Sequence, residues 1–378
     1  MRAAVLGWSV AALAACSHQQ PPPAPVAATV AQAPDAGVAA APSVDAGLGV
    51  ADQARAAAEA AKASIEGLML PSAPDLPKTP AFLGDAQEPP ENPTTKEKAA
   101  LGYQLFFDKR LSKSGMTSCE SCHHPDKAWT SGEALDKKDN GTMNKRNAPS
   151  MENLGYHQNG WYWDGRMPTL EKVSNAAWTG QLGATPAEVV ARLNAIAIYR
   201  AEFQRAFKED ASPDNVPRAL AAFLRSLKTG DAPWDKYEQG DKKAVSAQAI
   251  RGHKVFEDAH CALCHVPPLY TDTQFHAVGA GGAEDHGRMD ATKDPKDDGK
   301  FKTPTLRDVA RTAPYFHDGS AKDLATAVEF MLGGGKAVPN LDEKLKPAKV
   351  SAKGRDALVA YIESLTGTAT YPSAPPLP

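Results

Sequence analysis

A mainly α-helical fold of two tandem domains, with long irregular loops, is predicted by three features of the sequence. Apolar residues recur at spacings of three and four in several segments, with Ser, Thr or Asp near their starts. No segment shows the alternation of apolar and polar residues that predicts a strand. A short cysteine-containing unit occurs twice, once in each half of the chain.

The clearest helical patterns are residues 185–209, 216–230 and 350–367. Long connections rich in Gly, Pro, Asn and Asp separate the helices, among them residues 131–169 and 271–316. Loops of this length are uncommon in a compact domain unless something else organises them. A large embedded cofactor would do so.

The N-terminal segment predicts export. Residues 1–16 contain one arginine, an apolar run and small residues before Cys16, as in a signal peptide. The end of this run resembles a bacterial lipoprotein signal, in which Cys16 would be lipidated; a soluble secreted protein cut near Cys16 is the alternative. Residues 17–78 are rich in Ala and Pro and predict a disordered tether. We therefore expect a periplasmic protein that meets the membrane only through a lipid anchor.

The rest of the chain suits two domains, which we place at residues 79–238 and 239–372. The formal net charge of the whole chain is −3, and no basic patch suggests nucleic-acid binding. No stretch after the signal approaches the roughly 18 to 20 apolar residues of a membrane-spanning helix.

The repeated unit predicts a cofactor. Each copy has two cysteines separated by two residues and followed directly by histidine: Cys119, Cys122 and His123, then Cys261, Cys264 and His265. This is the attachment signature of c-type haem, in which the thiols form thioethers and the histidine ligates iron. A zinc site would usually separate its cysteine pairs by roughly 15 to 20 residues, and about 140 intervene here. Two covalently bound haems are therefore predicted.

Further segments carry a specific resemblance. They are LFFDKRLSKSGMTSCESCH (105–123), RNAPS (146–150), YWDGR (162–166), GKFKTPTLRDVARTAPYFHDGS (299–320) and LATAVEFM (324–331). From about residue 80 to 368 the chain resembles the bacterial dihaem cytochrome c peroxidase family, which includes the methylamine-utilisation dihaem oxidase. The resemblance implies two cytochrome c-like haem domains in a periplasmic enzyme. The N-terminal haem would reduce hydrogen peroxide, and the C-terminal haem would receive electrons from a small cytochrome or copper protein.

The resemblance also assigns individual residues. Met331 matches the sixth ligand of the second haem, a position that is Tyr in the oxidase branch; by pattern alone it is equally a core methionine, and Met289 is the weaker candidate. Trp163 matches a tryptophan that carries electrons between the haems, although packing is the usual role of a buried Trp. One calcium ion would be bound between the domains by Asn147 and the backbone carbonyls of Thr312 and Pro314.

The sequence departs from the family at the peroxide site. The family has a distal Gln and an acid–base Glu at positions that fall near Val173 and Gly183 here. Glu171 and Gln181 are the weak substitutes nearby, so the acid–base residue stays unknown. Loss of such a group lowers a rate by roughly 10² to 10⁴-fold.

The first haem also lacks the distal histidine that many family members carry about sixteen residues past the proximal one. His124 adjoins His123 and cannot easily reach the opposite face, and Met143 lies in a flexible segment. We expect this haem to be open to water or peroxide at rest.

Three functions remain possible on this basis. The first is a peroxidase, and the second is a dihaem electron carrier or sensor without efficient peroxide chemistry. The third is an oxidase acting on a protein substrate, against which Met331 argues. The sequence leaves the oligomeric state open between a monomer and a homodimer.

Overall fold

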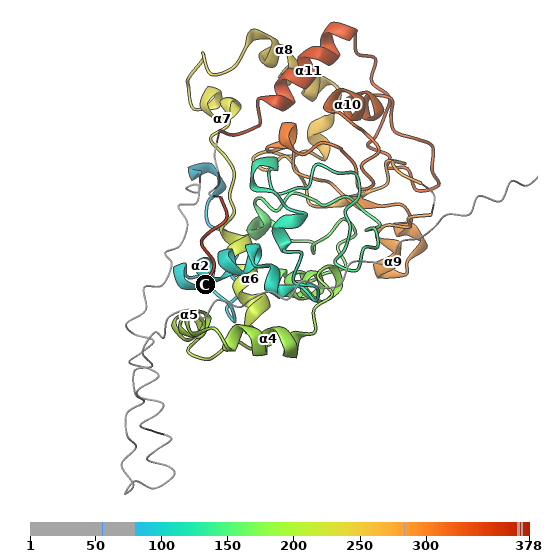
Figure 1. Cartoon of the computed structure of the whole chain (residues 1–378). Coiled ribbons are helices and arrows are strands. Elements are labelled where there is room, and N and C mark those ends of the chain that lie inside the picture. The colour runs from blue at the N-terminus through green and yellow to red at the C-terminus, as the bar shows by residue number, and fades with distance from the viewer. Residues whose placement is uncertain (1–54, 56–79, 283, 369–370, 372) are drawn as a thin grey trace, which may run out of the picture. The chain divides into compact units, whose positions relative to one another are not determined.

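The computed structural model describes residues 55, 80–282, 284–368, 371 and 373–378, and this part of the chain is mainly helical (Figure 1). Its sheet consists of two antiparallel strands of two residues each, β1 (Phe275–His276) and β2 (Phe301–Lys302). The predicted mainly α fold is therefore confirmed. Apart from residue 55, the predicted signal peptide (1–16), with Cys16, and the predicted tether (17–78) lie outside the described residues.

The connections between the helices contain short helical turns, and several of these connections are long. The α-helices of the described residues are α2 (Lys96–Phe107), α3 (Leu170–Ala176), α4 (Pro186–Asn194), α5 (Ala197–Phe207), α6 (Asn215–Ser226), α7 (Pro233–Glu238), α8 (Ala247–Asp258), α9 (Met289–Thr292), α10 (Leu324–Leu332) and α11 (Ala352–Glu363). A π-helical turn, η6 (Ala177–Gln181), directly continues α3. The segment 185–209, predicted as one helix, forms α4 and α5, because Ile196 between them has an extended backbone.

A first hydrophobic cluster is formed by α2 to α6 and the loops between them. Helices α2, α4, α5 and α6 lie close together in Figure 1. Its largest fully buried side chains are Trp129, Trp178, Tyr199, Phe106, Phe203 and Phe223. Burial of such aromatic side chains supplies much of the hydrophobic stabilisation of a core.

A second hydrophobic cluster is formed by α7, α8, α10 and α11. Its members include Trp234, Phe256, Tyr270, Tyr361 and Leu365. Trp234 of α7 is the first member of this cluster along the chain.

Each cluster contains a close helix crossing that requires glycine. A Cβ on Gly102 of α2 would lie 2.0 Å from the carbonyl oxygen of Ala219 in α6. A Cβ on Gly252 of α8 would lie 1.8 Å from the carbonyl oxygen of Ala357 in α11. In both halves, the helix that precedes the cysteine unit therefore packs backbone against backbone on the last long helix of its cluster.

After α11 the chain returns to the first cluster. Residues 371 and 373–378, which we call the C-terminal arm, pack there through the ring of Tyr371. The hydroxyl of Tyr103 donates to the carbonyl of Ser373, and Arg110 donates to the terminal Pro378 over 2.7 Å. Residues of the C-terminal arm therefore pack against the first cluster.

Candidate functional site

The first cysteine unit begins at η3 (Cys119–Ser121) and ends at His123. The Nδ1 of His123 lies 2.6 Å from the carbonyl oxygen of Trp129, so Nδ1 carries the proton and donates it. This hydrogen bond leaves Nε2 with a free lone pair, the arrangement of a metal-ligating histidine. Burial lowers the pKa of His123 to about 4, so the imidazole is neutral at pH 7.

The second unit has the same geometry. It begins at η7 (Cys261–Leu263), and the Nδ1 of His265 lies 3.0 Å from the carbonyl oxygen of Tyr270. Trp129 and Tyr270 both have left-handed backbones, with φ of 61° and 54°. These conformations turn their carbonyls back toward the imidazoles, and burial lowers the pKa of His265 as well.

The four cysteines of the units are free and partly buried. Burial raises the pKa of Cys119 to about 12 and that of Cys261 to about 11. Zinc requires thiolates, and among the described residues no group of metal-binding side chains brings the two cysteine pairs together. The zinc alternative therefore finds no support.

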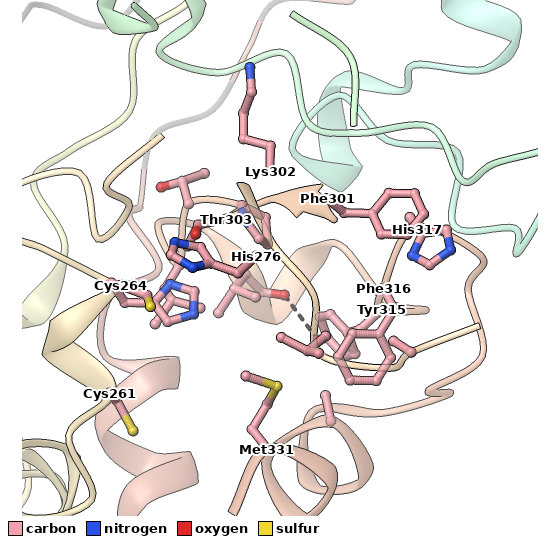
Figure 2. Close-up of a pocket in the computed structure, with 18 of the residues that line it drawn as sticks. Cys261, Cys264, His276, Phe301, Lys302, Thr303, Tyr315, Phe316, His317 and Met331 are labelled. Atoms are coloured by element: carbon pink, nitrogen blue, oxygen red, sulfur yellow. Dashed lines mark hydrogen bonds between the residues drawn. The ribbon is translucent and has the colours of Figure 1, made fainter. Parts of the chain in front are cut away.

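A cavity of about 320 Å³ lies beside the second unit. Figure 2 shows the sulfur of Met331 directed into it from α10, with Cys261 and Cys264 on another wall. Met289, in α9, is not among the lining residues. Thiols, an imidazole with a free nitrogen and a facing thioether meet around mostly apolar walls, so the residues present fit a covalently bound haem.

The sequence did not point to His276, which lies beside the second unit. Its Nδ1 is 2.6 Å from an Asp342 oxygen and its Nε2 is 2.9 Å from an Asp272 oxygen. The Cys264 sulfur and these two carboxylates raise the pKa of His276 to about 9, against the effect of burial.

Trp163 and the predicted calcium ligands lie on the wall of the same cavity. The indole nitrogen of Trp163 donates to the backbone carbonyl of Asn147 over 2.9 Å, and its ring contacts His317 edge to face at 6.4 Å between centroids. Asn147, Thr312 and Pro314 all line the cavity. The Asn147 side-chain nitrogen donates to the Glu133 carbonyl, which leaves the amide oxygen available as a ligand.

Arg146 joins the two halves of the chain next to Trp163. Its guanidinium donates to Asp164 over 2.6 Å and to both oxygens of Asp285 over 2.7 and 2.8 Å. All three side chains are largely buried. The guanidinium also lies over the ring of Phe301.

Glu171, one of the two weak acid–base candidates, is held in an ion pair. Its carboxylate accepts from Arg225 and from Asn92, each over 2.7 Å, in an ion pair between α3 and α6. Gln181 stays a candidate, because its buried side-chain oxygen has no partner among the described residues.

Asp139 is a carboxylate that the sequence reading missed. One of its oxygens would lie 3.8 Å from a Cβ on Gly183, and the position of the family's Glu falls near Gly183. Ser114 and Thr117, just before the first cysteine, donate to this carboxylate, and the Asp139 amide donates to the carbonyl of Gln181. Although burial acts to raise it, these hydrogen bonds lower the pKa of Asp139 overall.

Asp139 had a signal in the sequence, because it stands sixteen residues after His123. His124 and Met143 are the residues of this region that were considered as a sixth ligand of the first haem. His124 is paired with Glu120 at 3.1 Å, and Met143 is 50% exposed.

Comparisons with known proteins decide the family. The model of the di-haem cytochrome c peroxidase family matches residues 96–243. The methylamine utilization protein MauG of Methylophilus methylotrophus is 37% identical over 300 residues, which cover 77% of this chain and 88% of that protein. This chain belongs to the di-haem cytochrome c peroxidase family. The resemblance inferred from the motifs is thereby confirmed, and membership implies two haems c.

Other relatives span the activities of the family. The cytochrome-c peroxidase IdrP1 of Denitromonas iodatirespirans is 35% identical over 337 residues, covering 76% of this chain and 89% of that protein. The solved structure of a MauG-like protein associated with microbial copper homeostasis has a TM-score of 0.71 and 32% identity, covering 78% of this chain and 95% of that one.

Within the described residues, no helix has the length and apolar character needed to cross a membrane.

Proposed function

We propose that this family member is a c-type dihaem peroxidase that reduces hydrogen peroxide to water with electrons from a small periplasmic protein. The observation that carries the proposal is the pair of cysteine units, each with a buried neutral histidine whose Nδ1 is held by a backbone carbonyl. The first haem would be attached through Cys119 and Cys122, and the second through Cys261 and Cys264.

The two hydrophobic clusters and their matching glycine crossings support two tandem haem domains, with the boundary between Leu227 and Trp234. We keep export, lipidation of Cys16 and periplasmic location as part of the proposal. A homodimer is left to measurement.

The haems, when bound, supply the iron at which the peroxide O–O bond is cleaved and the stored electrons for its reduction. His123 and His265 would ligate through Nε2. The Asp139 carboxylate would take the proton from the attacking peroxide oxygen and return it to the leaving oxygen. Gln181 would orient the peroxide through its side-chain amide.

The second half would store and pass electrons. Met331 would complete the coordination of the second haem, and a His and Met pair favours a relatively high reduction potential. Trp163 would carry electrons between the haems, because it lies on the wall of the cavity beside the second cysteine unit, next to Asn147 and His317. A calcium ion at Asn147, Thr312 and Pro314 would fix this wall.

An oxidase that modifies a protein substrate is the second candidate. Two relatives named MauG, at 37% and 36% identity, favour it. Met331 opposes it, because the oxidase branch has Tyr at the matching position. A dihaem electron carrier or sensor is the remaining alternative.

Stopped-flow mixing of peroxide with the half-reduced protein tests the proposal. We expect rapid oxidation of the second haem with one peroxide consumed for two electrons, and a high-spin ferric first haem before any reduction. If the protein does not consume peroxide, the electron carrier or sensor becomes the favoured function. Slow turnover with small donors but rapid oxidation of an added protein would favour the oxidase. The denatured holoprotein should retain two covalent haems by pyridine haemochrome.

A further inference from the structure

A buried polar cluster, formed by Trp129, Tyr371, Glu152 and Asp308, links the first haem unit to the large cavity. Trp129 is fully buried, and its carbonyl holds the ring of His123. At the other end, Glu152 lines the cavity beside the second unit. None of the roles proposed above uses this cluster.

Trp129 and Tyr371 are in direct ring contact. Their rings meet edge to face with 5.2 Å between centroids. The Trp129 indole nitrogen is buried without a hydrogen-bond partner among the described residues, which is rare for a buried Trp. Tyr371 lies between Trp129 and the two carboxyl groups of the cluster, so an electron could pass from Tyr371 to Trp129 through the ring contact.

The Tyr371 hydroxyl has carboxyl groups beside it. It donates to the Lys228 carbonyl over 3.0 Å. Burial, and then the neighbouring Glu152 and Asp308 carboxyls, raise the pKa of Tyr371, so the phenol is protonated at neutral pH. Loss of an electron from a phenol makes its proton strongly acidic, so oxidation requires a group that can take this proton.

Glu152 and Asp308 form a pair that can take it. Glu152 is 1% exposed, and neither of its oxygens has a well-formed hydrogen bond within the described part of the chain. Burial, and then the charge of Asp308, raise the pKa of Glu152, so this carboxyl holds a proton. Burial raises the pKa of Asp308 as well, although the Gly367 amide and the Thr229 hydroxyl donate to its carboxylate and act to favour the ionised form.

We propose that Tyr371 is an internal electron donor to the first haem, through Trp129, with the Glu152 and Asp308 pair as its proton acceptor. The inference rests on the proposed peroxide reaction. Cleavage of the peroxide O–O bond releases one water that carries both peroxide protons, and it takes two electrons, of which the first haem would supply one and Tyr371 the other. Trp129 returns one electron to the haem, and Tyr371 reduces the Trp129 radical. The Tyr371 proton passes to Glu152 as the Glu152 proton passes to Asp308, which leaves a neutral tyrosyl radical.

The test is freeze-quench electron paramagnetic resonance of the fully oxidised holoprotein after one equivalent of hydrogen peroxide. In this state the second haem holds no ferrous electron, so an electron supplied by Tyr371 is not hidden by one from that store. We expect a tyrosyl radical signal that falls at least tenfold in Tyr371→Phe. In Trp129→Phe and Glu152→Gln the radical should form more slowly, with peroxide still consumed.

Tyr199→Phe is the matched control. Tyr199 is fully buried and its hydroxyl donates to the Asp108 carboxylate over 2.5 Å, but it lies outside the cluster. Its substitution should leave the radical unchanged. Haem content and thermal melting check that each variant is folded, and mass spectrometry of the peroxide-treated wild type should locate oxidation at Tyr371.

Two results would overturn the inference. One is peroxide consumption by the wild type with no radical and no modification at Tyr371, which would leave the peroxidase proposal standing. The other is an undiminished radical in a folded Tyr371→Phe. A wild type that does not react with peroxide at all would refute the peroxidase proposal and this inference together.

Discussion

Met331 is the residue that most directly sets the electron-storage role of the second haem. Met331→His should lower the reduction potential of that haem, because imidazole stabilises ferric iron more than a thioether does. Ascorbate should then no longer produce the half-reduced protein. Spectroelectrochemical titration gives the potential.

Met289→Leu is the control for this prediction, since Met289 does not line the cavity. It should leave the potential unchanged. An unaltered potential in Met331→His would mean that Met331 is only a packing residue.

Asp139 carries the second prediction at this scale. Asp139→Asn should lower the rate of peroxide cleavage by about 10² to 10⁴-fold, because the amide cannot accept the proton. The affinity for cyanide, which binds ferric haem, should stay close to that of the wild type. Stopped-flow spectroscopy of the half-reduced protein measures the rate.

Glu171→Gln separates chemistry from stability. This change weakens the Arg225 ion pair, so it should lower the melting temperature while leaving the rate per folded molecule unchanged. If Glu171→Gln slowed cleavage as much as Asp139→Asn, the assignment would return to Glu171.

Single residues show what the sequence could and could not predict about the site. Proximal histidines follow directly from the cysteine units, because the ligand and the thiols are adjacent in the chain. The ion pair of Glu171 with Arg225 could not be predicted, because the sequence does not say which way α3 faces. The contact between Trp129 and Tyr371 joins opposite ends of the domain region, and no local pattern marks it.

At the scale of elements, the loop of Arg146 is joined to the loop of Asp285 across the two halves. Although burial acts against it, Arg146 lowers the pKa of Asp285 well below its ordinary value. A carboxyl whose pKa is lowered by folding adds stability above its unfolded pKa, about 3.9, and this stability is lost as the pH falls toward the folded value.

Asp285→Asn should therefore reduce the free energy of unfolding by about 1 to 3 kcal/mol at pH 7. The difference from wild type should shrink as the pH falls below about 4. Denaturant unfolding at several pH values measures it. Asp290→Asn is the control, because Asp290 is half exposed and its carboxylate comes no closer than 3.9 Å to Arg146. A loss of similar size in Asp290→Asn would argue against a specific role for Asp285.

Helices were easier to predict than their ends. The pattern for 350–367 corresponds to α11, and that for 216–230 corresponds to α6. The pattern for 185–209 missed the break before α5, because it depends on distant contacts. Asn194 exchanges hydrogen bonds with the backbone of Ala211 at the end of α4.

At the scale of the whole molecule, the proposed calcium ion would couple the two halves. Exhaustive chelation should slow electron transfer between the haems without releasing haem, because Asn147 also holds the indole of Trp163. Flash photolysis or stopped-flow reduction can follow the transfer, and re-added calcium should restore it while magnesium should not. Metal analysis should show that the chelated protein holds no calcium. If electron transfer between the haems is unchanged in that protein, the calcium site is removed from the proposal.

The C-terminal arm gives the last prediction. A chain ended at residue 370 loses the Tyr371 ring from the first cluster and the contacts at Ser373 and Pro378. Its melting temperature should fall, and the spectrum of the first haem should change more than that of the second. Tyr371→Phe in the full-length chain is the control, since it keeps the ring. Equal spectral changes at both haems in the shortened chain would contradict the local effect.

The path of the arm also constrains how the protein is made. Residues near the end of the chain complete a core whose other members lie more than a hundred residues earlier, between α2 and α6. The first cluster therefore reaches its final packing only when residues 371 and 373–378 are in place. Before Tyr371 is in place the ring of Trp129 lacks this contact, so we expect haem attachment at Cys119 and Cys122 to precede the final packing of the first cluster.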